Sequence, residues 1–153
     1  MQESIPARFW QCMHDLEQSG IGFIVVGGLA LRMHGGNHLT EDLDISPSPE
    51  RENRDLLAAF LRAKHARPLG FPPATTFTVQ PEHGVDSFEG LWSRAVEMDL
   101  GGFVVRVASL EDLAAMKRAA DRPKDRLHLM EIAALIRLRD ETGEDTTDRN
   151  EEL

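Results

Sequence analysis

The chain has 153 residues, one cysteine and a formal net charge of −9, and 41% of its residues are hydrophobic. This length and apolar fraction fit a single globular domain, and the lone Cys12 excludes an internal disulfide and a cysteine zinc cluster. No apolar run approaches the roughly 20 residues that span a bilayer, and the first residues carry no signal-peptide pattern. We therefore expect a cytoplasmic protein without membrane contact.

The negative charge is unevenly distributed along the chain. Residues 140–153 contain seven acids and one arginine, whereas residues 117–139 contain seven Lys or Arg and three acids. We expect a globular domain over residues 1–140, followed by an acidic and disordered tail over residues 141–153. The basic helical region would suit phosphate groups, although a solvated helix surface is the commoner explanation of such a pattern.

The first elements in chain order are a helix and a strand. Apolar residues at helical spacing predict a helix over residues 3–19. The continuous run GFIVV at 22–26 predicts a strand that is covered on both faces. Gly27 and Gly28 end this strand and leave room for about two turns of helix behind them.

Alternating polar and apolar residues follow in LTEDLDIS, which predicts a strand over residues 39–46 near the middle of the sheet. Asp42 and Asp44 lie two positions apart and therefore share one face of this strand. Apolar spacing then predicts a helix within residues 47–65, and residues 68–73 read as a loop.

The second half of the chain begins with two short predicted strands at 75–80 and 85–88. Residues 94–100 and 103–108 flank a glycine pair and predict a hairpin. The sequence SLED then resembles a capping box at the start of a helix that carries Lys117. A last helix is predicted over residues 123–139, and its apolar side is expected to consist of Leu127, Met130, Ala134 and Leu138. This order of elements predicts an α/β (α+β) fold, a mixed sheet with helices packed on it.

The chemistry concentrates in the stretch from Gly27 to Asp44. Two carboxylates side by side repel each other unless a cation lies between them, and Mg²⁺ prefers such hard oxygen ligands together with substrate phosphates. Glycines at a strand-to-helix turn let the backbone approach a ligand, and the first N–H groups of a helix favour an anion. The stretch therefore predicts a phosphate site beside a Mg²⁺ or Mn²⁺ site, as in phosphoryl or nucleotidyl transfer.

These motifs resemble the nucleotidyltransferase superfamily, in particular the minimal bacterial proteins related to AbiEii toxins and MNT-type small nucleotidyltransferases. The matching stretches are VVGGLALRMHG, LTEDLDI and SLEDLAAMKRAADRPKDRLHLMEIAAL. Small proteins of this group often carry a Lys followed by Arg-x-x-Asp near the C-terminus, which are Lys117, Arg122 and Asp125 here. The resemblance covers about residues 20–138 and implies a nucleotidyltransferase-like mixed sheet in a single small domain.

The resemblance also implies which carboxylates hold the metal. Asp42 and Asp44 would coordinate Mg²⁺ or Mn²⁺, and a third carboxylate on a later strand would be a metal ligand or a general base. Asp86 is expected to be this third residue, because it follows a β-branched residue after a turn. Asp99, on the predicted hairpin, stays open as the alternative.

The nucleotide-binding residues implied by the resemblance are Gly27, Gly28, Thr40 and Lys117, which would contact the triphosphate. The chain departs from the family pattern at two positions. Its Gly-Gly replaces the Gly-Ser of the superfamily, and His38 stands where related proteins often carry an arginine.

The activity that the resemblance implies is transfer of a nucleoside monophosphate from a nucleoside triphosphate to a hydroxyl group. The acceptor stays open between tRNA, a protein and a small molecule, and a cognate antitoxin-type protein is an expected partner. The alternative is a catalytically degenerate binding module that acts with a protein partner. A sugar-nucleotide glycosyltransferase with its own Asp-x-Asp is disfavoured, because the chain is small and the Gly-Gly pair is not part of that pattern.

Overall fold

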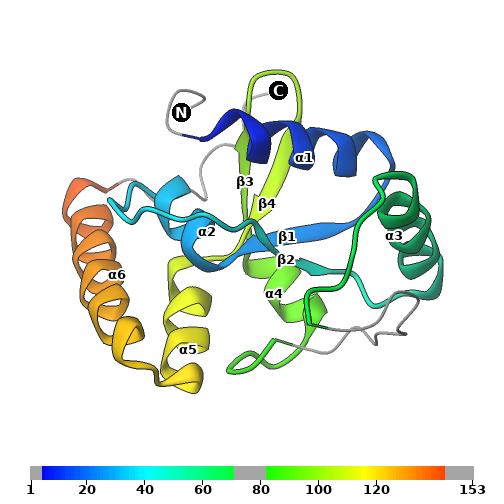
Figure 1. Cartoon of the computed structure of the whole chain (residues 1–153). Coiled ribbons are helices and arrows are strands. Elements are labelled where there is room, and N and C mark those ends of the chain that lie inside the picture. Colours follow the sequence, from blue (N-terminus) through cyan, green and yellow to red (C-terminus); the bar gives the residue numbers. More distant parts are fainter. Residues whose placement is uncertain (1–4, 71–81, 144–153) are drawn as a thin grey trace.

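The structure is a mixed α/β sheet with helices packed around it (Figure 1), which confirms the predicted fold class. It is a computed structural model and describes residues 5–70 and 82–143. The helices of these ranges are α1 (Ala7–Gln18), α2 (Gly27–Met33), α3 (Arg51–Ala63), α4 (Phe88–Arg94), α5 (Leu110–Ala120) and α6 (Pro123–Thr142). The strands are β1 (Phe23–Val26), β2 (Asp44–Pro47), β3 (Val96–Asp99) and β4 (Val104–Val107).

The described strands form one sheet in the order β2-β1-β4-β3. β1 pairs antiparallel with β2 and parallel with β4, and β3 pairs antiparallel with β4 as the predicted hairpin. All four residues of β1 are buried, as expected for a continuous apolar strand covered on both faces. In Figure 1, α5 and α6 lie side by side near the end of β1 at which α2 begins.

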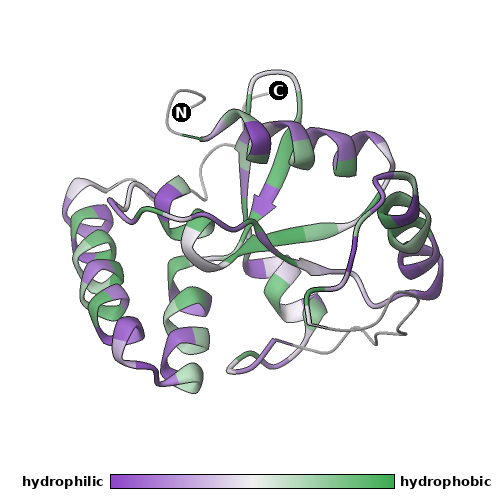
Figure 2. Ribbon diagram, viewed as in Figure 1, coloured by the Kyte–Doolittle hydropathy of each residue, from purple (hydrophilic) through white to green (hydrophobic). Residues whose placement is uncertain are grey.

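The hydrophobic core is formed between the sheet and the helices that cover it. Side chains from α1, β1, α2, β4 and α5 are among those at most 1% exposed, for example Met13, Ile24, Leu29, Val107 and Leu113. Figure 2 shows the hydrophobic colouring along β1, with hydrophilic residues on the outward parts of α1 and α3. The core therefore supports β1 from several directions, and the chain leaves this rigid strand directly into Gly27.

Two predicted strands differ from the structure. The strand predicted over residues 39–46 begins only at Asp44 and lies at an edge of the described sheet, so Asp42 belongs to the segment before it. Residues 85–88 form no strand, because the Ser87 side chain accepts a hydrogen bond from Gly90 N at 3.0 Å and caps α4 instead. The predicted strand at 75–80 lies outside the described residues.

The last helix is longer than predicted and presents a different face to the protein. α6 continues to Thr142, past the expected start of the tail, and residues 144–153 lie outside the described ranges. Its buried residues are Asp125, His128 and Ile132. The residues predicted to form its apolar side point outward instead, and Leu127 and Met130 are each 70% exposed. The buried face also carries Leu129 and Leu135, which pack on the core beside Ile132, and the polar contacts of Asp125 and His128 are described below.

One buried side chain connects α3 to the sheet. Asn53 accepts a hydrogen bond from Gly22 N at 2.7 Å, and its amide donates to Gly22 O at 3.0 Å and to Ser48 O at 2.9 Å. These contacts fix the residue before β1 to the chain that follows β2. They leave no backbone group of Gly22 unpaired.

We expect Asn53→Ala to lower the free energy of unfolding by about 2–3 kcal/mol, because it removes three hydrogen bonds and leaves partly buried backbone groups unpaired. Asn37→Ala is the matched control, since Asn37 is exposed and its contact to Glu131 uses only the backbone N–H. Urea unfolding of both variants measures the difference. Equal, small losses would show that the Asn53 contacts add nothing to stability.

Candidate functional site

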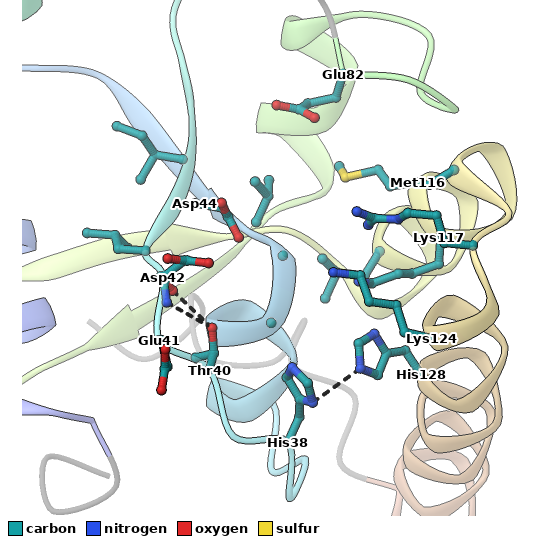
Figure 3. Close-up of a pocket in the computed structure, with 18 of the residues that line it drawn as sticks. His38, Thr40, Glu41, Asp42, Asp44, Glu82, Met116, Lys117, Lys124 and His128 are labelled. Atoms are coloured by element: carbon teal, nitrogen blue, oxygen red, sulfur yellow. Dashed lines mark hydrogen bonds between the residues drawn. The ribbon is translucent and has the colours of Figure 1, made fainter. Parts of the chain in front are cut away.

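A large open groove of about 1210 Å³ lies where β1, β2, α5 and α6 meet. One side carries the acidic residues Glu41, Asp42, Asp44 and Glu82, and the other carries Lys117, Arg122, Lys124 and His128. Figure 3 shows Asp42 and Asp44 on the side of the sheet, facing Lys117 and Lys124 on the side of the two helices. Leu113, Met116 and Ala120 contribute apolar surface between the two sides. The groove therefore offers sites for a cation and for an anion next to each other.

Gly27 and Gly28 form the floor of the groove between these two sides. Gly27 has a φ angle of 69°, which L-residues rarely adopt, and a Cβ atom at Gly27 would overlap the Asp44 carboxylate. A Cβ atom at Gly28 would lie 2.8 Å from His38 Cδ2 and 3.3 Å from Thr40 Cβ. Because neither position has a side chain, the backbone lies close to Asp44, His38 and Thr40.

Thr40 organises the turn that carries the first acid of the Asp-x-Asp pair. Its hydroxyl donates to Asp42 O at 3.1 Å and accepts from Asp42 N at 3.3 Å. This local pairing bends the chain before β2 begins at Asp44. Asp42 and Asp44 consequently reach the same groove from a turn and from a strand, and not from two positions of one strand.

Two carboxylates of the groove, those of the exposed Asp44 and the half-buried Glu82, have raised pKa values. Burial, together with the charge of Asp42, raises the pKa of Asp44 above its ordinary value, and the cations on the opposite side only partly oppose this. Burial, together with the charge of Asp44, likewise raises the pKa of Glu82, with the Ser46 side chain acting in the opposite direction. A cation bound between these groups would remove the repulsion that both shifts record.

The structure does not bring Asp86 into this groove. Its carboxylate pairs with Arg94 at 2.8 Å, which lowers its pKa, and it lines a separate cavity of about 190 Å³. Asp99 is also elsewhere, because it lies on β3 and accepts from Gly101 N at 2.8 Å in the hairpin turn. The acid that accompanies Asp44 is Glu82, from the turn before α4.

Glu82 was missed in the sequence analysis because a strand was predicted over VDSF. Ser87 is in fact the N-cap residue of α4, and a serine directly before FEGLWSR could have indicated the start of a helix there. With the helix starting at Phe88, Asp86 falls beside the first turn of α4, where Arg94 and Gly90 surround it. The turn that precedes the helix then turns Glu82 towards β2.

The basic side of the groove is held by one buried carboxylate. Asp125 is 1% exposed and accepts from Arg122 N at 3.0 Å and from Arg122 Nε at 2.9 Å, and Lys117 Nζ lies 3.3 Å from it. The hydrogen bonds from Arg122, with the nearby Lys117 cation, hold the pKa of Asp125 well below its ordinary value. Lys117 therefore lines the groove and pairs with Asp125.

A contact between two histidines joins the acidic loop to α6. His38 Nδ1 lies 3.1 Å from His128 Nε2, and the two rings meet edge to face with centroids 4.2 Å apart. Asn37 N also donates to the Glu131 carboxylate at 2.6 Å, so two successive loop residues contact the same helix. The loop that precedes Asp42 is thereby attached to the basic side.

The carboxylates of the groove suit a divalent metal that takes some of its ligands from the protein and the others from water and a bound substrate. Within residues 5–70 and 82–143, no group of three or more His, Cys, Asp or Glu side chains is placed to hold a metal by itself. Mg²⁺ usually takes one or two carboxylates and completes its shell with water and phosphate oxygens, and Asp42 and Asp44 provide two hard oxygen donors. The repulsion at Asp44 supports this fit.

The comparisons with known proteins return no relative. No protein-family model matches the chain, and no curated protein or solved structure matches it. In the part of the chain that the structure describes, no helix is both long and apolar enough to cross a membrane. The functional assignment therefore depends on the residues and geometry of this groove.

We expect Asp125→Asn to lower the free energy of unfolding by about 3 kcal/mol or more at neutral pH, because Lys117 and Arg122 lose the charge that compensates them. A carboxylate with a lowered pKa stabilises the protein above its unfolded pKa, and this contribution is lost as the pH falls through the lower folded value. The deficit of the variant should thus shrink as the pH falls below about 4. Asp140→Asn, at an exposed position of α6, is the control, and a constant deficit at all pH values would contradict this account.

Proposed function

We propose that the protein is a metal-dependent nucleotidyltransferase that binds a nucleoside triphosphate in this groove. The observation that carries the proposal is the pairing of an acidic side, where Asp42 and Asp44 lie close together, with a basic side across a floor without side chains. A triphosphate with a divalent cation has complementary charges, since its metal would face the acids and its oxygens would face the cations. The resemblance of the Gly-Gly and Asp-x-Asp segments to nucleotidyltransferases supports the same assignment.

Each side of the groove has a distinct role in this proposal. Asp42 and Asp44 would hold Mg²⁺ or Mn²⁺, which when bound polarises the phosphoryl group and neutralises its charge. Gly27 and Gly28 let the polyphosphate approach the backbone. Lys117 and Lys124 supply positive charge on the opposite side, with Lys117 oriented by its pairing with Asp125.

Glu82 replaces Asp86 as the third carboxylate of the proposed site. Its raised pKa favours the protonated form more than usual, so its carboxylate is a better proton acceptor than an exposed glutamate. It would accept the proton of the acceptor hydroxyl as that oxygen attacks the α-phosphorus and pyrophosphate leaves. The acceptor classes in this proposal are tRNA, a protein side chain and a small molecule.

The thermal stability of Asp44→Asn tests metal and nucleotide binding. Without ligand we expect its melting temperature to equal or exceed that of the wild type, because a carboxylate with a raised pKa opposes folding when it is charged at neutral pH. With millimolar Mg²⁺ and nucleoside triphosphate the wild type should gain stability, about 2.7 kcal/mol at a hundredfold excess over Kd, and the variant should lose this gain.

Asp86→Asn is the matched control for this measurement, since Asp86 lies outside the groove and should leave the ligand-induced gain intact. A wild type indifferent to Mg²⁺ with every nucleoside triphosphate would reject the proposed function. A ligand gain kept in Asp44→Asn would overturn the role of Asp44 as a metal ligand, and a gain lost in Asp86→Asn would place Asp86 at the bound ligand.

A transfer assay identifies the acceptor and tests Glu82. The protein is incubated with each radiolabelled nucleoside triphosphate, Mg²⁺ or Mn²⁺, and either total RNA or cell lysate. We expect label on one class of acceptor, and we expect Glu82→Gln to reduce the rate by about a hundredfold or more with nucleotide binding retained. Glu89→Gln is the control, because this exposed glutamate lines only the smaller cavity.

A catalytically degenerate binding module remains the second candidate function. The observation that favours it is the absence, within the described ranges, of a preformed group of three metal-binding side chains. Nucleotide binding by the wild type without label on any acceptor would support this candidate. Transfer that depends on Glu82 would exclude it.

A further inference from the structure

The contact between His38 and His128 determines where both imidazoles carry their protons. The two facing atoms are His38 Nδ1 and His128 Nε2, 3.1 Å apart, so one of them must donate and the other accept. His128 is 8% exposed, and its other nitrogen, Nδ1, is buried without a hydrogen-bond partner among the residues that the structure describes. A buried N–H group without a partner costs more than a buried lone pair. The proton of His128 therefore lies on Nε2, from which it is donated to His38.

This assignment fixes the tautomer of His38 as well. Because His38 Nδ1 accepts the hydrogen bond, the neutral ring carries its proton on Nε2. His38 Nε2 would lie 3.0 Å from a Cβ atom at Gly28, so the N–H group adjoins the floor of the groove. Figure 3 shows the second nitrogen of His38 on the side of the groove, away from the dashed contact to His128.

The charged groups around His128 keep the pair in this state. Lys117 on α5 faces it, and Asp125 and Glu131 belong to its own helix, while His38 is its neighbour on the loop. Burial, and then the charge of Lys117, lowers the pKa of His128, which favours the neutral ring near neutral pH. A neutral His128 has one N–H group to donate, and His38 Nδ1 is the acceptor in reach.

We propose that His38 is a binding residue of the groove, whose Nε2–H donates to a phosphoryl oxygen of a polyphosphate seated on Gly27 and Gly28, and that His128 is the positioning residue that fixes its tautomer. This inference rests on the proposed function, since it needs a polyphosphate in the groove. It assigns a directional N–H donor to a position next to the cations Lys117 and Lys124.

The first test needs no ligand. Long-range ¹H–¹⁵N NMR correlations of the full chain at pH 7.5 report which nitrogen of each imidazole is protonated. We expect both His38 and His128 to carry the proton on Nε2 and a lone pair on Nδ1. We expect His128→Ala to leave His38 as a mixture of tautomers. Protonation of His38 on Nδ1 in the wild type would overturn the inference.

The second test measures the affinity for tripolyphosphate with Mg²⁺ by titration calorimetry. We expect His38→Ala to weaken binding on the order of tenfold, as for loss of a hydrogen bond to a charged group. His128→Ala should weaken it by a smaller factor. His128→Gln should restore wild-type affinity, because the glutamine amide supplies an N–H donor in place of Nε2. His65→Asn, at the end of α3 outside the groove, is the histidine control.

The outcomes separate this inference from the proposed function. Wild-type affinity in His38→Ala, beside a wild type that binds tripolyphosphate and loses it in Asp44→Asn, would overturn the inference alone. Equal affinities of His128→Ala and His128→Gln would reject the positioning role of His128. A wild type that binds neither tripolyphosphate nor a nucleoside triphosphate would overturn both, since His38 would then have no anion to contact.

Discussion

The geometry of the groove depends on the buried carboxylate of Asp125. An ionised carboxylate in the interior is tolerated only where donors and counter-charges surround it, and Arg122 and Lys117 provide both. Because Arg122 precedes α6 and Lys117 lies on α5, this one group ties the start of α6 to α5. His128 lies inward on the same helix, towards the loop of the opposite side.

Within the described residues, the acidic side of the groove is organised by close contact between the backbone and a carboxylate, and not by an ion pair. Gly27 leaves the rigid strand β1 with a positive φ angle, and the carboxylate of Asp44 occupies the space where a side chain would otherwise lie. Burial and the repulsion of neighbouring carboxylates raise the pKa values of Asp44 and Glu82 there. Lys117 and Arg122 thus have Asp125 as their counter-charge on one side of the groove, whereas the acids of the other side would gain free energy when a cation arrives. Such an asymmetry suits a ligand that brings its own metal.

Local sequence patterns predicted the parts of the fold that are decided locally. The apolar run of β1, the alternation of the β3–β4 hairpin and the capped start of α5 each contain enough information in a few residues. The sequence also predicted that the glycines and acids of the Gly27–Asp44 segment lie together. Their spacing along the chain brings them to one groove even though β2 begins later than predicted. Thr40 and Asp42 reach the groove although they precede β2.

The features that sequence did not predict depend on contacts between distant residues. Whether Asp86 or Glu82 enters the groove is decided by the cap of α4 and by the Arg94 side chain, which lies beyond both acids in the chain. α6 carries apolar residues on two sides, so the helix sequence alone does not decide which side is buried. The side with Leu129, Ile132 and Leu135 packs on the core, and the contacts of Asp125 and His128 with distant residues lie on that same side.

The outward face of α6 has a consequence for reading mutational data on this protein. In mutational scans, apolar positions that tolerate substitution are commonly taken as disordered, and positions that do not are taken as part of a hydrophobic core. Along α6 this interpretation is incomplete, since the exposed Leu127 and Met130 fill no core while the buried polar Asp125 and His128 are constrained by their partners. A helix register deduced from Leu127 and Met130 would be rotated by about half a turn relative to the real one, in which Leu129, Ile132 and Leu135 face the core.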